Sequence, residues 1–135
     1  MFKRFYIKRA VEALWLGSLL LILVASFLPE GTAIAELATA AWWNFGHIPA
    51  YALLAGLTLA VVSQRVTLTF GLFVGLAVGV ALIGLTIEVL QPHFGRTASV
   101  ADFAYDMIGI LFAMVAFFFI NRGGQVWRFL AKPSK

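Results

Sequence analysis

Four apolar runs, separated by short polar connections, dominate the pattern of hydrophobic and polar positions along this chain. The runs cover residues 11–28, 47–62, 68–91 and 102–120. At about 1.5 Å per residue, helices formed by runs of this kind can cross the roughly 30 Å hydrocarbon core of a bilayer. The pattern therefore predicts an all-α integral membrane protein, a four-transmembrane-helix bundle in which residues 1–135 form one domain.

Prolines and a polar turn set the predicted ends of these runs. Pro29 stops the first run, and residues 63–65 form the turn after the second. The third run ends at Gln91, because Pro92 disfavours the helical conformation in the residue before it. Pro49 is compatible with the first turn of the second helix, where the early N–H groups have no intrahelical partners.

The connection between the first two runs, residues 30–43, is less apolar and ends in Trp42 and Trp43. Tryptophan favours the headgroup layer of a membrane, so we predict a short interfacial helix here. The first run also has features of a signal-peptide core, with small residues at Ala33 and Ala35 after it. Its length is near the upper limit for such a core, so we expect a retained helix. An intact mass beginning after Ala35 would show cleavage instead.

Composition supports a membrane protein and excludes some functions. The chain is 62% hydrophobic and 12% charged, with a mean hydropathy of +0.96, and a soluble domain of 135 residues could not bury that much apolar surface. The isoelectric point near 9.9 does not indicate nucleic-acid binding, because the basic residues lie at the chain ends rather than in a patch. The absence of cysteine excludes disulfides, thiolate metal sites and a thiol nucleophile.

The basic residues also predict an orientation. Nine of the ten Lys and Arg residues lie in the amino end, the turn at Arg65 and the carboxyl tail. By the positive-inside rule, both termini of this multi-pass protein face the cytoplasm. The connections at 30–43 and 92–100 then face outward, and we expect the unusual polar residues to gather at one outer level.

Small residues recur every four positions on the second and third predicted helices. Stripes of this kind let helices approach one another closely. We interpret them first as packing within the monomer, with homodimerisation through the third-helix stripe as the alternative. The second-helix stripe is Ala52, Gly56 and Ala60, and the third-helix stripe is Gly71, Gly75 and Gly79.

Three of the six acidic residues lie in the stretch 88–109, between apolar segments. Ser99 and Asp102 have the spacing of a capping box, in which the hydroxyl accepts from an early helix amide and the carboxylate reaches back to the N–H of the cap. Asp106 lies about 6 Å deeper along the same face, and Glu88 lies inside the third helix, so capping explains neither. Because a charged group costs about 2.5–3.5 kcal/mol at the bilayer centre, both mark a candidate site.

Four further residues complete this candidate site. Gln91 follows Glu88 by one turn, and Arg96 either holds the loop through the carboxylates or binds an anionic group. His47 begins the second helix at the same level and Tyr51 follows one turn later; the histidine fits either a hydrogen-bonded anchor or a functional group. The candidate catalytic residues are His47, Glu88 and Asp106, and the candidate substrate-binding residues are Arg96, Gln91, Asp102 and Tyr51.

About half of the chain, from Trp43 to Gly109, resembles the VanZ-like family of small bacterial membrane proteins. The resemblance rests on a helix-start histidine followed by Ala50-Tyr51, on the segment EVLQPHFGRTASVAD, and on Gly109 in the next helix. It implies a location in the bacterial cytoplasmic (inner) membrane and a ligand among cell-envelope lipids or lipoglycopeptides, since the family's namesake is associated with teicoplanin resistance. The family's polar positions fall on His47, Glu88, Gln91, Arg96 and Asp102.

Two departures from the family pattern make this site more negative. Trp43-Asn44 stands where the family often has an Asp-Lys pair, and Asp106 stands where it commonly has Asn. Three carboxylates against Arg96 leave an excess of negative charge, so the site needs a protonated carboxyl, a protonated His47 or a bound cation. A cationic ligand group or a divalent metal fits better than a phosphate alone, and the residues specify neither a particular metal nor another cofactor.

Three functions remain open at this point. The first is a protein that binds or modifies the head group of a membrane lipid or lipid-linked envelope molecule. The second is a membrane-embedded hydrolase or transferase, in which His47 and a carboxylate act on water or a metal-bound water. The third is an oligomeric scaffold built on the glycine stripe.

Overall fold

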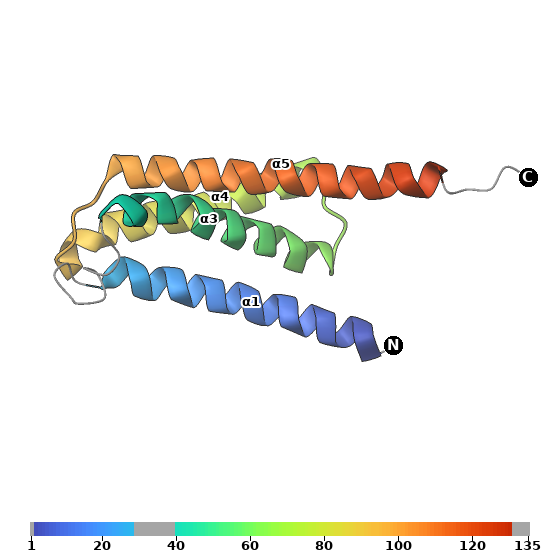
Figure 1. Cartoon of the computed structure of the whole chain (residues 1–135), viewed down its shortest axis with the longest axis horizontal. Coiled ribbons are helices and arrows are strands. Elements are labelled where there is room, and N and C mark those ends of the chain that lie inside the picture. The colour runs from blue at the N-terminus through green and yellow to red at the C-terminus, as the bar shows by residue number, and fades with distance from the viewer. Residues whose placement is uncertain (1, 29–39, 131–135) are drawn as a thin grey trace, which may run out of the picture.

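The computed structural model describes residues 2–28 and 40–130, with side chains described for 5–28 and 46–121. Figure 1 shows its helices running side by side along one axis. They are α1 (Phe2–Phe27), α3 (Ala40–Ser63), α4 (Phe70–Leu90), the short 3-10 helix η1 (Gln91–Phe94) and α5 (Val100–Leu130).

Four of these helices are long and apolar enough to cross a membrane. The qualifying segments are Phe5–Phe27, Gly46–Ser63, Phe70–Phe94 and Val100–Asn121. The predicted all-α architecture with four such helices is therefore confirmed for the described part of the chain. The predicted interfacial helix falls mostly on residues 29–39, which lie outside the described residues, while residues 40–43 belong to α3.

Several predicted helix ends are wrong. α1 begins at Phe2 rather than at residue 11. α3 begins at Ala40 rather than residue 47, so Pro49 lies inside the helix, where it has no N–H to donate to the carbonyl four residues earlier. α5 begins at Val100 rather than 102 and continues to Leu130 instead of ending at 120. Polar residues and a glycine pair did not end this helix, because such residues lower helix propensity without blocking the backbone hydrogen bonds as proline does.

α3 and α5 approach each other closely through their backbones. A Cβ added at Gly109 of α5 would clash with the carbonyl oxygen of Ile48 and lie 3.0 Å from the backbone nitrogen of Ala52. One turn further along, a Cβ at Gly56 would lie 4.0 Å from that of Ala113, in ordinary contact. The small residues of α3 therefore pack inside the monomer, as predicted, and this packing fixes the depth of α5 against α3.

The glycine stripe of α4 behaves differently. A Cβ at Gly71, Gly75 or Gly79 would meet nothing within 4 Å among the described atoms. Packing of this stripe within the monomer was therefore a wrong interpretation. The helix turns its other face inward instead, with Ala77, Val80, Gly84, Ile87 and Glu88 buried.

α1 packs along α3 and is held there by two polar contacts. The Trp15 indole N–H donates to the hydroxyl of Thr58 over 2.9 Å, and Arg65 pairs with Glu12 over 2.6 Å. Figure 1 shows α1 and α5 on opposite sides of α3 and α4. The end of α1, the start of α3, η1 and the start of α5 all lie at the same end of the bundle, which we call the site end.

Candidate functional site

A tight turn after α4 returns the chain toward Glu88. η1 ends at Gly95, whose φ of 73° lies in the left-handed region that favours glycine. The N–H of Gly95 bonds to the carbonyls of Gln91 and Pro92, and the N–H of Arg96 donates to Gln91 over 3.2 Å. This turn brings Ser99, the residue before α5, back over the last turns of α4.

The start of α5 is capped by two side chains. The Ser99 hydroxyl accepts from the N–H of Asp102 over 3.3 Å, which confirms the predicted cap. The reciprocal half of the predicted capping box is wrong, because the N–H of Ser99 donates to the Glu88 carboxylate over 2.8 Å rather than to Asp102. Glu88 is thus explained in part as a cap supplied by another helix, and Asp102 is released to face α3.

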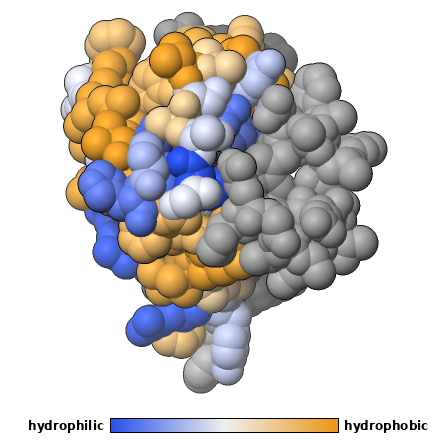
Figure 2. All heavy atoms as spheres, turned by 90° about the vertical axis from the view of Figure 1, so that its left-hand side faces the viewer, coloured by the Kyte–Doolittle hydropathy of each residue, from blue (hydrophilic) through white to orange (hydrophobic). Residues whose placement is uncertain are grey.

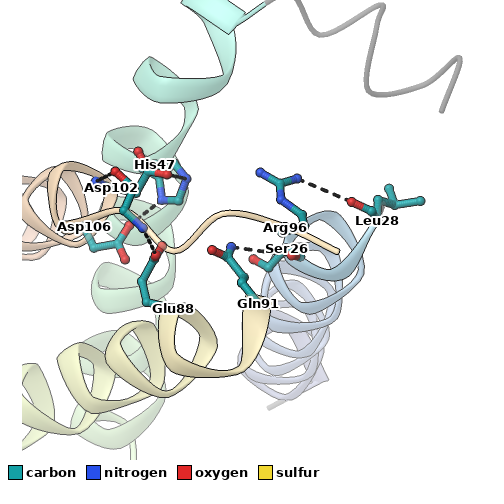
Figure 3. Close-up of polar contacts among 9 residues, drawn as sticks. Ser26, Leu28, His47, Glu88, Gln91, Arg96, Asp102 and Asp106 are labelled. Carbon is teal, nitrogen blue, oxygen red and sulfur yellow. Dashed lines mark hydrogen bonds and ion pairs between the residues drawn. The ribbon is translucent and has the colours of Figure 1, made fainter. Parts of the chain in front are cut away.

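His47 lies between the two aspartates of α5 (Figure 3). Its Nδ1 lies 2.7 Å from Oδ1 of Asp106, and its Nε2 lies 3.9 Å from Oδ2 of Asp102. The two aspartates can face the same imidazole because they are one helical turn apart. A carboxylate at Nδ1 orients the ring and leaves Nε2 available to accept or donate a proton.

Tyr51 and Gly84 complete the walls around this pair. The Tyr51 ring lies parallel to that of His47, within 5°, at a centroid distance of 6.4 Å. A Cβ added at Gly84 would lie 2.8 Å from Oδ2 of Asp106 and 3.2 Å from the Tyr51 hydroxyl. Sequence reasoning missed Gly84, although its position one turn before Glu88 could have indicated that it faces the site.

The site is buried and rich in acid. The exposed fraction is 1% for Asp106, 6% for Glu88 and 8% for Asp102. All three carboxyl groups are close enough to His47 to interact with it electrostatically. Figure 2 views the site end and shows hydrophilic residues gathered near its middle, with apolar residues above and below them. One imidazole balances at most one of three negative charges, so the site needs either a protonated carboxyl group or a ligand that brings positive charge.

Arg96 does not bridge the carboxylates, contrary to one of the two expectations for it. Among the described residues it makes no ion pair with Glu88 or Asp102. Its Nη1 donates to the carbonyl of Leu28 over 3.5 Å, on the side where α1 ends (Figure 3). A long side chain on a loop can turn either way, so the sequence could not fix this direction.

Gln91, which directly follows α4 as the first residue of η1, also contacts α1. It is 1% exposed, and its side-chain nitrogen donates to the carbonyl of Ser26 over 3.5 Å. Its side-chain oxygen, Oε1, and Oε1 of Glu88 are both buried and have no hydrogen-bond partner among the described residues. Two buried acceptor oxygens one turn apart are costly unless a donor reaches them.

The described residues do not form a ready metal site. No group of three or more His, Asp or Glu side chains in the described part of the chain is arranged to hold a metal ion. The site instead combines an oriented imidazole, excess carboxyl groups and acceptor oxygens that need donors.

Comparison with protein-family models, with curated proteins and with solved structures gave no match for this chain. The VanZ-like resemblance therefore stays a prediction, and the chemistry of the site has to be argued from its geometry.

Proposed function

We propose that this chain is a VanZ-like membrane protein whose polar site binds or modifies the head group of a cell-envelope lipid or lipoglycopeptide. The proposal places it in the bacterial cytoplasmic membrane, with both termini in the cytoplasm and the site end facing outward. Through this binding it would contribute to resistance against teicoplanin-type glycopeptides. Arg96, which lies in the loop before α5 and donates to the carbonyl of Leu28 just after α1, is the proposed contact for an anionic part of the head group.

The observation that carries the proposal is the contact between His47 and Asp106. The two side chains meet over 2.7 Å, and Asp106 is 1% exposed at one end of four helices that are long and apolar enough to span a membrane. Buried ionisable groups within membrane-spanning segments usually mark functional sites, because burying them carries a cost that packing alone does not require.

The proposal is tested by expressing the chain in a glycopeptide-susceptible bacterium and measuring growth inhibition by teicoplanin. We expect Asp106→Asn and Glu88→Gln to lose protection at unchanged membrane abundance. Glu12→Gln is the matched control, because Glu12 is an acid of α1 whose partner is Arg65, outside the site. Full protection in both site variants would overturn the proposal.

An enzymatic role is the second candidate, and the same contact favours it. With Asp106 orienting Nδ1, His47 could use Nε2 as a general base toward water in hydrolysis or group transfer. Mass spectrometry of lipids extracted from expressing cells distinguishes binding of the head group from its chemical modification. A new head-group mass that disappears in Asp106→Asn indicates turnover, whereas unchanged lipid masses together with protection indicate binding.

Homodimerisation through Gly71, Gly75 and Gly79 is proposed as a partner interaction. It is supported by the open space beside these glycines, since small-residue stripes allow close helix contact. Gly75→Leu should convert a dimer in mild detergent to a monomer, as measured by light scattering. A monomeric wild type would overturn it.

A further inference from the structure

A groove between α1 and α3 opens beside the site. Its volume is about 290 Å³, and it is the space between the last turns of α1 and the first described turns of α3. Its apolar wall consists of Leu21, Ile22, Ala25 and Ala50, and its polar end contains His47 and Gln91. An apolar channel that ends at buried polar groups has the form of a site for an amphiphile, with the chain along the wall and the head at the end.

The polar end needs hydrogen-bond donors. Gln91 lines the groove, is 1% exposed, and has its oxygen without a partner among the described residues. Figure 3 shows its nitrogen turned toward Ser26 and its oxygen turned toward the side where Glu88 lies. Glu88, one turn earlier, presents a second buried oxygen with no partner in the described part of the chain. A ligand with several N–H donors would satisfy both oxygens.

The same end also favours positive charge. His47 lines the groove, and behind it lie the carboxyl groups of Asp102 and Asp106, 3.9 and 2.7 Å from its ring nitrogens. These two aspartates and Glu88 are all more than nine-tenths buried. A cationic group placed among them would offset their repulsion in a medium of low dielectric constant. A primary ammonium supplies both needs, since it carries one positive charge and three N–H donors.

We infer that the groove binds one molecule of a membrane phospholipid with a primary ammonium head group, as in phosphatidylethanolamine. One acyl chain would lie between α1 and α3, and the ammonium would reach Gln91 and Glu88. Because both walls belong to helices that could span a membrane, the lipid would enter sideways from the bilayer. This inference rests on the head-group site of the proposed function and names the chemistry that it selects.

The experiment is native mass spectrometry of the full chain in a mild detergent, titrated with three phospholipids of identical acyl chains. Phosphatidylethanolamine has charge and N–H donors, phosphatidylcholine has the charge without N–H donors, and phosphatidylglycerol has hydroxyl donors without the cation. We expect phosphatidylethanolamine to bind about tenfold or more tightly than either, as estimated for hydrogen bonds to charged groups. Equal binding of all three would overturn the inference.

Two variants locate the lipid. Ala25→Trp fills the groove and should reduce phosphatidylethanolamine binding about tenfold, whereas Leu20→Trp adds the same ring on a residue of α1 that is 60% exposed and should leave it unchanged. Glu88→Gln keeps an oxygen for the Ser99 N–H and should remove the preference for the ammonium. Unchanged phosphatidylethanolamine binding in Ala25→Trp, or an intact preference for the ammonium in Glu88→Gln, would overturn the inference.

The outcomes separate this inference from the proposed function. If Asp106→Asn abolishes teicoplanin protection while the wild type shows no lipid preference, the inference fails and the proposed function stands. If the preference for phosphatidylethanolamine is lost in Glu88→Gln while protection persists in both Glu88→Gln and Asp106→Asn, the proposed function fails and the lipid site stands.

Discussion

Among the described residues, each end of the bundle contains a short ionic contact, and the two contacts differ mainly in burial. At the site end, His47 and Asp106 meet over 2.7 Å with side-chain exposures of 14% and 1%. Toward the opposite end, Arg65 and Glu12 meet over 2.6 Å with exposures of 67% and 27%. An exposed pair contributes about 0–1 kcal/mol, whereas removing one member of a buried pair typically costs about 3–5 kcal/mol. Contact distance alone therefore says little about the importance of an ion pair.

The cavities at the two ends differ in volume and in the polar groups that line them. A large cavity, about 810 Å³, lies at the turn between α3 and α4, near Arg65 and Phe117. Among the residues whose side chains are described, no Asp, Glu or His lines it. The groove at the site end is smaller, about 290 Å³, but it reaches His47 and Gln91. A functional site in this protein is indicated by buried polar groups rather than by the amount of space.

The largest expected effect comes from breaking the buried contact. Asp106→Ala should lower the free energy of unfolding by about 3–5 kcal/mol, because it removes one partner of a buried pair. Glu12→Ala, which breaks a contact of similar length, should cost much less, because water screens this exposed pair. Unfolding in mixed detergent micelles measures both. Equal losses would show that burial does not distinguish the two ends.

A smaller effect is expected where α5 approaches α3. Gly109→Ala should cost about 1–3 kcal/mol, because the new Cβ overlaps the carbonyl oxygen of Ile48 and the helices must separate. Gly17→Ala in α1 is the control, since a Cβ there meets nothing within 4 Å and alanine favours helix. The same unfolding measurement applies. A Gly109→Ala variant as stable as the wild type would contradict the close packing.

Ser99 caps α5 at the site end, and Thr69 caps α4 at the opposite end, so the two positions can be compared directly. Ser99→Ala should cost about 1 kcal/mol, because it removes the hydroxyl that caps the start of α5. Under the proposed function it should also reduce protection against teicoplanin, because the turn that loses its cap carries the N–H that holds Glu88. Thr69→Ala removes the cap of α4 at the other end, where the hydroxyl accepts from Leu72, and should cost a similar amount with protection unchanged. Parallel loss of protection in both would mean that stability alone controls function.

The smallest effect is expected at the exposed pair. Arg65→Ala should lower the free energy of unfolding by at most about 1 kcal/mol at low salt. Because exposed charges are screened, the difference from the wild type should shrink further as the salt concentration rises. A loss that is large or independent of salt would show that Arg65 acts through contacts other than its charge.

The sequence by itself determined the helical segments and several of their local features. Four apolar runs predicted the four long helices, Pro92 marked the end of α4, and Ser99 was recognised as a cap. The second-helix stripe was also recognised as internal packing. These features depend on hydrophobic periodicity and on bonds within one or two turns, so nearby residues suffice to predict them.

Only the tertiary structure decided how the polar side chains pair. Glu88 took the place expected for Asp102 in the cap, Asp102 turned to His47, and Arg96 turned to the end of α1. Gly84 proved to make room for Asp106 and Tyr51, and the groove beside Gln91 formed between two helices distant in sequence. Each outcome depends on the depth and rotation of one helix against another, which no local pattern encodes; the close approach of α3 at Gly109 is one example.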